Sequence, residues 1–340
     1  MKFTILVTSK CNLRCSYCYE KSKLYENMTF EIADKTIDFI EDRLNRELVK
    51  RPLQVIFHGG EPLLNFELVK YMRDSINHRI NDREIIFDMT TNATVINDDI
   101  ISFLKNDIDN LSVSIDGTKE INDANRIFSD GTGTYDIIIR NCKILLENNI
   151  NPRVRMTYNS KNISALCNGI TSIINSGIKE IAVAPDIYDN RWDVENITLL
   201  REQVFKINDL QNENNKISIS LVDKILLSQK KGNCFGGINN FTIDEVGNIY
   251  PCTFCVGKKE FIIGQVNDLN ISSKKTNRLI DIYKSKNQDC IGCSRYDNCT
   301  SSRCKIINKL STGEYNNPAF VFCAQENVNV DLIKSINENI

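Results

Sequence analysis

Six apolar, strand-like runs alternate with amphipathic helical stretches in the N-terminal part of the chain, and this alternation constrains the fold more than any other feature. The runs are Phe3–Thr8, Leu53–Phe57, Ile85–Thr90, Leu111–Ile115, Arg153–Tyr158 and Glu180–Ala184. Strands that alternate with helices pair in parallel through right-handed crossovers. Six units fall short of a closed barrel, so we expect an α/β fold based on a partial (β/α)6 TIM-type barrel. Its functional residues should lie at the carboxyl ends of the strands.

The helical stretches show the matching periodicity. The first has apolar residues at spacings of 4, 3, 4 and 4, which predicts a helix with one apolar face. The residues of that face are Ala33, Ile37, Ile40, Leu44 and Leu48. Further helices are expected over residues 134–149, after residue 162, and over residues 197–214, and Thr134 is the expected N-cap of the first of these.

The alternation stops near residue 190, and a segment rich in glycine and cysteine follows. Phe241–Ile243 and Asn248–Tyr250 flank Gly247 and predict a β-hairpin. Eight of the 13 cysteines lie between Cys234 and Cys323. We therefore expect a (β/α)6 core at residues 1–215, a linker at 216–232 and a small cysteine-rich α+β domain with a hairpin at 233–340.

The overall composition excludes several classes of protein. A net charge of -2 over 340 residues gives no electrostatic reason to expect binding to nucleic acid or to an anionic membrane. The chain has no apolar run long enough to span a membrane and no secretory signal. Thirteen cysteines without an export signal indicate metal ligation in a reducing compartment, so we expect a cytoplasmic protein.

Three cysteines follow the first strand-like run within eight residues. Cys11, Cys15 and Cys18 have the spacing C-x3-C-x2-C. Thiolates favour soft metal centres such as iron–sulfur clusters. Three ligands are one fewer than the usual four, so one iron would stay open to a substrate or cosubstrate. A zinc knuckle is the alternative, although this spacing is not common for zinc.

This motif resembles the cluster motif of the radical S-adenosylmethionine (radical SAM) superfamily, and Tyr17 occupies its usual aromatic position before the last cysteine. The resemblance implies a [4Fe–4S] cluster whose open iron binds S-adenosylmethionine. Reduction would then generate a 5′-deoxyadenosyl radical that abstracts a hydrogen atom from the substrate. The cofactor supplies this chemistry, while the protein orients it and excludes water.

The second strand-like run ends in a further match. Gly59, Gly60 and Glu61, followed by proline, resemble the Gly-Gly-Glu-Pro motif that receives the methionine amine in this superfamily. Glycines allow close approach to the backbone, and a carboxylate can accept a hydrogen bond from an ammonium group.

Three further residues match positions that contact S-adenosylmethionine in the family. They are Asn92, Ser114 and Arg126, each of which follows or ends a strand-like run or lies in the next loop. The alternative for these residues is ordinary loop polarity. His58 and His78 are the only histidines; we expect the first to be structural and the second to lie at the surface, so no catalytic acid or base is assigned.

The later cysteines resemble the signature of the SPASM extension of peptide-modifying radical SAM enzymes. The elements are C-x12-G-x4-C and C-x2-C-x5-C-x4-C followed by a last cysteine, and the x4 gap stands where the family usually has x3. The resemblance implies two auxiliary [4Fe–4S] clusters, three clusters in all. One would be held by Cys290, Cys293, Cys299 and Cys323 and the other by Cys234, Cys252 and Cys304.

Cys255 has two interpretations. It could complete the second auxiliary cluster, which we favour, or it could be outside the cluster and leave an iron open to a substrate thiolate. A zinc ribbon is the alternative for the whole segment. Cys142 and Cys167 line up with apolar residues at helical spacing and are expected to be buried and structural.

The resemblance implies an enzyme that crosslinks or oxidises a side chain of a ribosomally made peptide or a protein. One alternative is a sulfatase-maturating enzyme that forms formylglycine; such relatives carry an Asp after the cysteine of the G-x4-C element, where this chain has Thr253. Another is a non-catalytic iron–sulfur or zinc scaffold. The expected partners are a peptide or protein substrate and a flavodoxin- or ferredoxin-type reductant. Because the motif begins at Cys11, we also expect either a separate leader-peptide-binding protein or recognition of the substrate by the core itself.

Overall fold

The predicted strands form where the sequence placed them. The computed structural model describes residues 1–19, 25–214 and 216–338. The predicted runs become β1 (Lys2–Leu6), β2 (Leu53–His58), β3 (Ile85–Thr91), β4 (Asn110–Ser114), β5 (Arg153–Tyr158) and β6 (Glu180–Pro185). Neighbouring strands pair in parallel, as in β1 with β2 and β5 with β6, so the predicted α/β class is confirmed.

Contacts between residues divide the chain into two compact units, each assembled from separated stretches. The first contains Met1–Ser114, Arg126–Pro152 and Phe235–Ile280, and the second contains Ile115–Asn125, Arg153–Cys234 and Asp281–Ile340. The sequence-defined order of a core at 1–215, a linker at 216–232 and a cysteine-rich domain at 233–340 stays a prediction.

The sheet of the first unit has the strand order β11-β10-β9-β8-β1-β2-β3-β4. Its later strands are β8 (Asn240–Ile243), β9 (Asn248–Tyr250), β10 (Gly264–Gln265) and β11 (Asn270–Ile271). The predicted hairpin is confirmed, since β8 and β9 are antiparallel and Gly247 has φ +86° in the turn. The sequence did not predict that β8 would pair in parallel with β1. Phe3 lies opposite Phe241, and their rings stack with centroids 5.4 Å apart.

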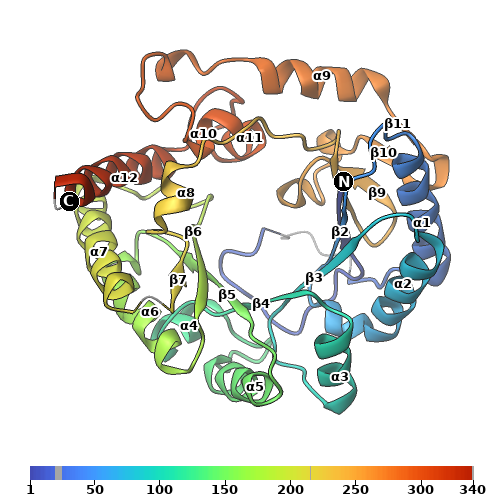
Figure 1. Ribbon diagram of the computed structural model, residues 1–340, viewed down its shortest axis with the longest axis horizontal. Coiled ribbons are helices and arrows are strands. Elements are labelled where there is room, and N and C mark those ends of the chain that lie inside the picture. The colour runs from blue at the N-terminus through green and yellow to red at the C-terminus, as the bar shows by residue number, and fades with distance from the viewer. Residues whose placement is uncertain (20–24, 215, 339–340) are drawn as a thin grey trace. The chain divides into compact units, whose positions relative to one another are not determined.

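Helices cover the outer side of this sheet, where α1, α2 and α3 lie beside β1–β3 (Figure 1). The helices are α1 (Phe30–Asn45), α2 (Phe66–Arg79), α3 (Asp98–Asn106) and α5 (Tyr135–Glu147), and α9 (Ser273–Lys284) begins in this unit. Short 3-10 turns are η1 (Pro62–Asn65), η3 (Thr253–Cys255), η4 (Lys259–Phe261) and η5 (Val266–Asp268).

Helix α1 begins at a hydroxyl cap, because Thr29 Oγ1 accepts a hydrogen bond from Ile32 N at 3.2 Å. Four of the five residues predicted for its apolar face are buried, from Ala33 to Leu44. The prediction for Leu48 was wrong. The helix ends at Asn45, so Leu48 lies beyond it in the connection to β2 and is exposed.

The expectation for the N-terminus of α5 was only partly right. Thr134 precedes the helix as its N-cap residue, but its side chain does not cap it. Instead Thr134 Oγ1 donates to Arg126 O at 2.8 Å, so the hydroxyl ties the start of the helix to the preceding loop. Within α5, Cys142 is fully buried beside Ile138 and Leu145, as predicted.

The second unit contains β5, β6 and β7 (Ser218–Ile219), which pair in parallel. Its helices are α4 (Lys119–Asn125), α6 (Leu166–Asn175), α7 (Val194–Glu213), α8 (Lys224–Ser228), α10 (Thr300–Arg303), α11 (Lys305–Thr312) and α12 (Phe320–Glu338), with 3-10 turns η2 (Ile163–Ala165) and η6 (Gln288–Cys290). A capping box between Asp193 and Asn196 starts α7. Cys167 on α6 is only partly buried, in contrast to the prediction, because Leu166 and Ile170 face the core instead.

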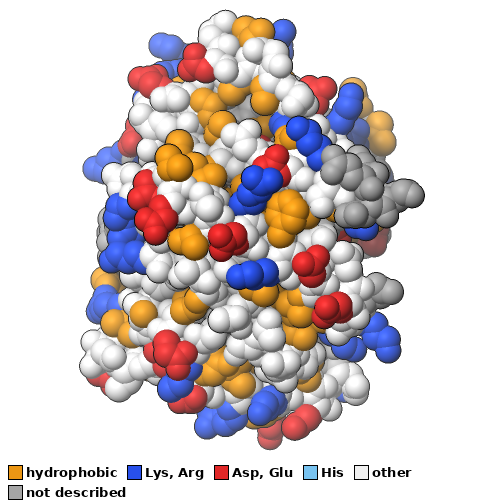
Figure 2. Space-filling view, turned by 90° about the vertical axis from the view of Figure 1, so that its left-hand side faces the viewer, with side chains coloured by type: hydrophobic (Ala, Val, Ile, Leu, Met, Phe, Trp, Pro, Cys, Tyr) orange, Lys and Arg blue, Asp and Glu red, His pale blue; other side chains and the backbone are white. Residues whose placement is uncertain are grey.

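The surface agrees with the near-neutral composition. On the face drawn in Figure 2, basic and acidic side chains are interspersed with scattered hydrophobic ones. Within the ranges that the structure describes, no helix combines the length and the apolar character that crossing a membrane requires.

Candidate functional site

The loop that follows β1 presents Cys11, Cys15 and Cys18, all of which are partly exposed. Leu13, between the first two, is 2% exposed and anchors the loop in the core of the first unit. Leu13 N donates to Cys11 Sγ at 3.4 Å, and Cys18 N donates to Cys15 O at 3.2 Å. The three sulfurs therefore come from one short loop that is fixed at its middle.

The end of β2 packs tightly against the segment that leads to these cysteines. Gly60 N donates to Thr8 O at 2.8 Å. A Cβ at Gly60 would lie 2.2 Å from Lys10 O, and a Cβ at Gly59, which has φ +142°, would lie 2.3 Å from Thr8 O. Both glycines are therefore required by the close approach of the chain's own backbone. The predicted approach of a ligand to the same glycines stays a prediction.

Glu61 joins the ends of β2 and β3. Its side chain is 1% exposed and accepts hydrogen bonds from Thr91 Oγ1 (2.7 Å), Asn92 N (2.7 Å) and Leu63 N (3.2 Å). Burial raises the pKa of Glu61, while these hydrogen bonds and the charge of Arg126 oppose that shift. Because a carboxylate offers about four acceptor positions, the protein itself occupies most of them. The acceptance of an ammonium group by Glu61 stays a prediction.

Asn92 connects the end of β3 to the cysteine loop. Its Nδ2 lies 3.9 Å from Cys11 Sγ and donates to Asn12 Oδ1 at 2.9 Å. Thr94 Oγ1 donates to Asn92 Oδ1 at 2.7 Å, which fixes the orientation of the amide. An N–H group is therefore directed at the sulfur of Cys11.

Arg126 and Tyr17, two more of the predicted residues, contact each other. Arg126 is 7% exposed, and its Nη1 donates to Tyr17 Oη at 2.6 Å. Ser114 is the last residue of β4 and is partly exposed. His58 Nδ1 accepts a hydrogen bond from Gly59 N at 2.8 Å, a structural contact of the kind expected, and His78 is exposed.

The second unit brings three of the later cysteines together. Cys290 ends η6, Cys293 follows one turn later, and Cys323 lies on α12. Each of Cys290 and Cys293 acts electrostatically on Cys323 and helps to raise the pKa of its thiol, after the larger effect of burial. In the same way Cys234 lies close enough to Cys304 to raise its pKa, again after burial. The assignment of these cysteines to two ligand sets stays a prediction.

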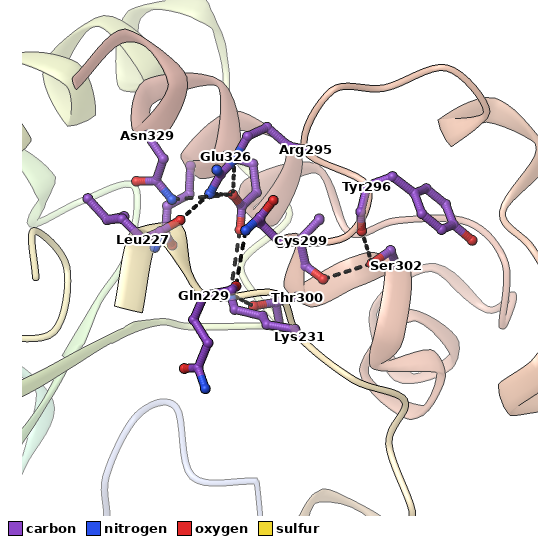
Figure 3. A network of polar contacts seen from close by, with 12 residues as sticks. Leu227, Gln229, Lys231, Arg295, Tyr296, Cys299, Thr300, Ser302, Glu326 and Asn329 are labelled. Carbon is purple, nitrogen blue, oxygen red and sulfur yellow. Dashed lines mark hydrogen bonds and ion pairs between the residues drawn. The ribbon is translucent and has the colours of Figure 1, made fainter. Parts of the chain in front are cut away.

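Cys299 stands at the start of α10 in a polar network that connects three segments (Figure 3). Arg295 donates to Glu326 Oε2 at 3.1 Å and to Leu227 O at 2.9 Å. Lys231 pairs with the other oxygen of Glu326 at 3.7 Å and donates to Thr300 Oγ1 at 3.0 Å. These contacts fix the loop before Cys299 against α12 and the segment after α8. A cavity of about 360 Å³ adjoins the network and is lined by residues that include Arg303 and Asn329.

Cys252 and Cys255 belong to the first unit. Cys252 precedes the turn η3 and Cys255 ends it; Cys255 N donates to Cys252 O at 2.9 Å, and Cys255 is fully buried. Thr253, in the position where sulfatase-maturating relatives carry Asp, has its Oγ1 3.4 Å from Thr242 Oγ1.

Comparison with known proteins identifies the family of this chain. The profile of the "Radical SAM superfamily" matches residues 5–162. An uncharacterised protein from Methanocaldococcus jannaschii is 30% identical over 272 residues, which is 79% of this chain and 90% of that protein. This chain belongs to the radical SAM superfamily. This radical SAM enzyme is also 27% identical to the cysteine-type anaerobic sulfatase-maturating enzyme of Clostridium novyi over 326 residues, 86% of this chain and 85% of that enzyme.

Two solved structures share the fold of this radical SAM enzyme. The sulfatase-maturating enzyme anSMEcpe with bound AdoMet has a TM-score of 0.80 at 21% identity, covering 100% of this chain and 95% of that one. Streptococcus suis SuiB bound to its precursor peptide SuiA has a TM-score of 0.65 at 16% identity, covering 95% of this chain and 75% of that one.

The residues at the first site fit the [4Fe–4S] cluster and S-adenosylmethionine that the superfamily implies. The cysteines are present as thiols, and N–H donors from Leu13 and Asn92 point to the sulfur of Cys11, as suits a thiolate ligand. Among the described residues, no three His, Cys, Asp or Glu side chains converge closely enough to hold a single metal ion. A cluster spaces its thiolates farther apart, because four irons and four sulfides lie between them.

Some residues of these sites carried no signal in the sequence. Glu245 lies beyond the end of β8 and is 5% exposed; burial raises its pKa, and a hydrogen bond from Ser9 opposes the shift. Its neighbour Asp244 is held by its own hairpin, through Asn248 N at 2.8 Å and Tyr250 Oη at 3.1 Å. Only the parallel pairing of β8 with β1 brings Glu245 to the edge that carries the cysteine loop, so local spacing could not identify it.

Proposed function

We propose that this radical SAM enzyme oxidises or crosslinks a side chain of a peptide or protein, and that it does so with one S-adenosylmethionine-binding and two auxiliary [4Fe–4S] clusters. The observation that carries the proposal is that each of the two units has thiols of its own. One group follows β1, another gathers Cys290, Cys293 and Cys323, and Cys234 lies near Cys304. Electron-accepting centres apart from the radical-generating one suit an oxidation.

The residues at the carboxyl ends of strands β1–β4 would bind and orient the cosubstrate. When bound, the first cluster and S-adenosylmethionine supply one-electron cleavage of the sulfonium and a hydrogen-abstracting radical. We propose that Asn92 hydrogen-bonds Cys11 Sγ, that Glu61 holds the β2 and β3 loops in place, and that Arg126 and Tyr17 bind the cosubstrate's polar groups. Gly59, Gly60 and Ser114 complete the proposed cosubstrate site.

For the auxiliary clusters we propose the ligand sets that the sequence implies. One set is Cys290, Cys293, Cys299 and Cys323, and the other is Cys234, Cys252, Cys304 and Cys255. The cytoplasm suits these ligands, because thiols persist in a reducing compartment. A flavodoxin- or ferredoxin-type protein is the proposed reductant, and a separate leader-peptide-binding protein is a further proposed partner.

Formylglycine formation is the second candidate, and the match to the Clostridium novyi enzyme along most of both chains favours it. That reaction needs a proton acceptor, and Thr253 provides no carboxylate. Glu245 is a candidate substitute, since its neighbour Asp244 is engaged by its hairpin. The Glu245→Gln variant should therefore lose formylglycine formation while it still cleaves S-adenosylmethionine, if this candidate is right.

The proposal is tested with anaerobically reconstituted protein, dithionite and S-adenosylmethionine. We expect 5′-deoxyadenosine, and about twelve irons per chain for three four-iron clusters. Intact clusters without 5′-deoxyadenosine would support a scaffold instead. Mass spectrometry of candidate substrates separates the two reactions. Loss of hydrogen with retention of sulfur indicates a crosslink, whereas replacement of a cysteine sulfur by oxygen together with the loss of two hydrogens indicates formylglycine.

A further inference from the structure

A fully buried lysine lies beside the cysteines of the second unit. Lys305 is the first residue of α11, directly after Cys304, and its side chain is 0% exposed. Its Nζ donates a hydrogen bond to Asn287 Oδ1. Within the described residues, the group that acts electrostatically on Lys305 is the Cys290 thiol and not a carboxylate. Burial lowers the pKa of Lys305, because an ammonium without a compensating negative charge is strongly unfavourable there, and an anionic neighbour would keep it charged.

Asn287 connects this lysine to Cys290. The amide is itself 0% exposed, and its Nδ2 donates to Ser301 O at 3.2 Å. Cys290 N donates to Asn287 O at 3.1 Å, so the backbone of Asn287 holds the turn that carries the Cys290 thiol. The Lys305 ammonium donates to the side-chain oxygen of Asn287. This contact polarises the Asn287 amide and strengthens its N–H groups as donors.

We propose that Lys305 and Asn287 are positioning residues that raise the reduction potential of the auxiliary cluster bound through Cys290. The inference rests on the proposed function, because it requires a cluster at Cys290. Hydrogen bonds to a ligand sulfur and a nearby positive charge both stabilise the more negative, reduced form. The step is the uptake of one electron, from a substrate-derived radical in turnover or from dithionite in the test. No bond is formed or broken, and no proton is transferred.

The experiment is a potentiometric titration of the reconstituted holoenzyme with dithionite, followed by electron paramagnetic resonance with and without S-adenosylmethionine. Signals that the cosubstrate leaves unchanged belong to auxiliary clusters. In Lys305→Met, which removes the charge and the hydrogen bond, the ratio of reduced to oxidised cluster at a fixed potential should fall about tenfold, or about 59 mV for one electron. Lys305→Gln keeps a donor to Asn287 and should show a smaller fall, and Lys305→Arg keeps the charge and should stay near the parent.

Lys309→Met is the matched control, since it removes a lysine one turn further along α11 whose Nζ contacts Gly313 O instead. It should leave every potential unchanged. Full iron content with an unchanged potential in Lys305→Met and Lys305→Gln overturns the inference alone. About four irons per chain in the parent overturns the proposed auxiliary clusters, and the inference with them. If both neutral variants lose iron, retention in Lys305→Arg supports the role of the charge, and loss in all three refutes it.

Discussion

Replacement of Glu61 by alanine should unfold the edge of the sheet that carries the candidate site. The substitution leaves three buried donors without their acceptor, namely Thr91 Oγ1, Asn92 N and Leu63 N. A buried donor left unsatisfied costs about 1–3 kcal/mol, so the total is about 3–9 kcal/mol if no water replaces the carboxylate. The free energy of unfolding of a whole domain is only about 5–15 kcal/mol. In Glu61→Gln, the amide oxygen can still accept from two of the donors, but the NH2 group faces the third donor and cannot accept from it. This substitution should therefore cost about 1–3 kcal/mol.

The free energy of unfolding is measured on cluster-free protein by urea titration with far-UV circular dichroism, and the exchange rate of the Asn92 amide is followed by mass spectrometry or NMR. Glu67→Gln is the control, because that carboxylate is 77% exposed and forms only a surface pair with Lys70, so it should change stability by less than about 0.5 kcal/mol. If Glu61→Ala costs less than about 1 kcal/mol and leaves the Asn92 amide protected, the carboxylate does not organise this edge and the reasoning is wrong.

Three further substitutions test separate features. Gly60→Ala places a Cβ 2.2 Å from Lys10 O and should displace the cysteine loop, seen as loss of iron at the first site, whereas Gly232→Ala, with no heavy atom within 4 Å of the new Cβ, should load normally. Cys255→Ser should lower the iron content of the reconstituted protein if the buried thiol is a ligand; unchanged iron would mean that it is not one. Burial acts to raise the pKa of Asp189, but hydrogen bonds from Arg191 and Ser160 lower it to about 2. Its stabilisation is therefore complete above pH 3.8 and should be lost as pH falls toward 2, so Asp189→Asn should destabilise the protein at neutral pH and progressively less across that window.

The strands and the cysteine loop could be predicted because their signals are local. Apolar runs such as Leu53–Phe57 specify a strand through neighbouring side chains, and the spacing of Cys11, Cys15 and Cys18 is fixed by the covalent chain. The sequence-based predictions were wrong where a contact with a distant part of the chain overrode the local pattern. Leu48 continues the periodicity of α1, but the chain has already turned toward β2, and the Thr134 hydroxyl bonds Arg126 O rather than capping α5.

The sequence by itself determined the α/β class, the radical SAM motif and the set of thiols available for clusters, because periodicity and spacing are properties of short segments. Only the tertiary structure revealed that β8 extends the sheet beside β1, that Glu61 is enclosed by donors from the β3 end, and that Lys305 is buried beside Asn287. Each of these depends on residues distant in sequence meeting in space. Burial strengthens the electrostatic interactions and hydrogen bonds of these groups, which would interact only weakly in water. A local sequence pattern does not show which groups are buried.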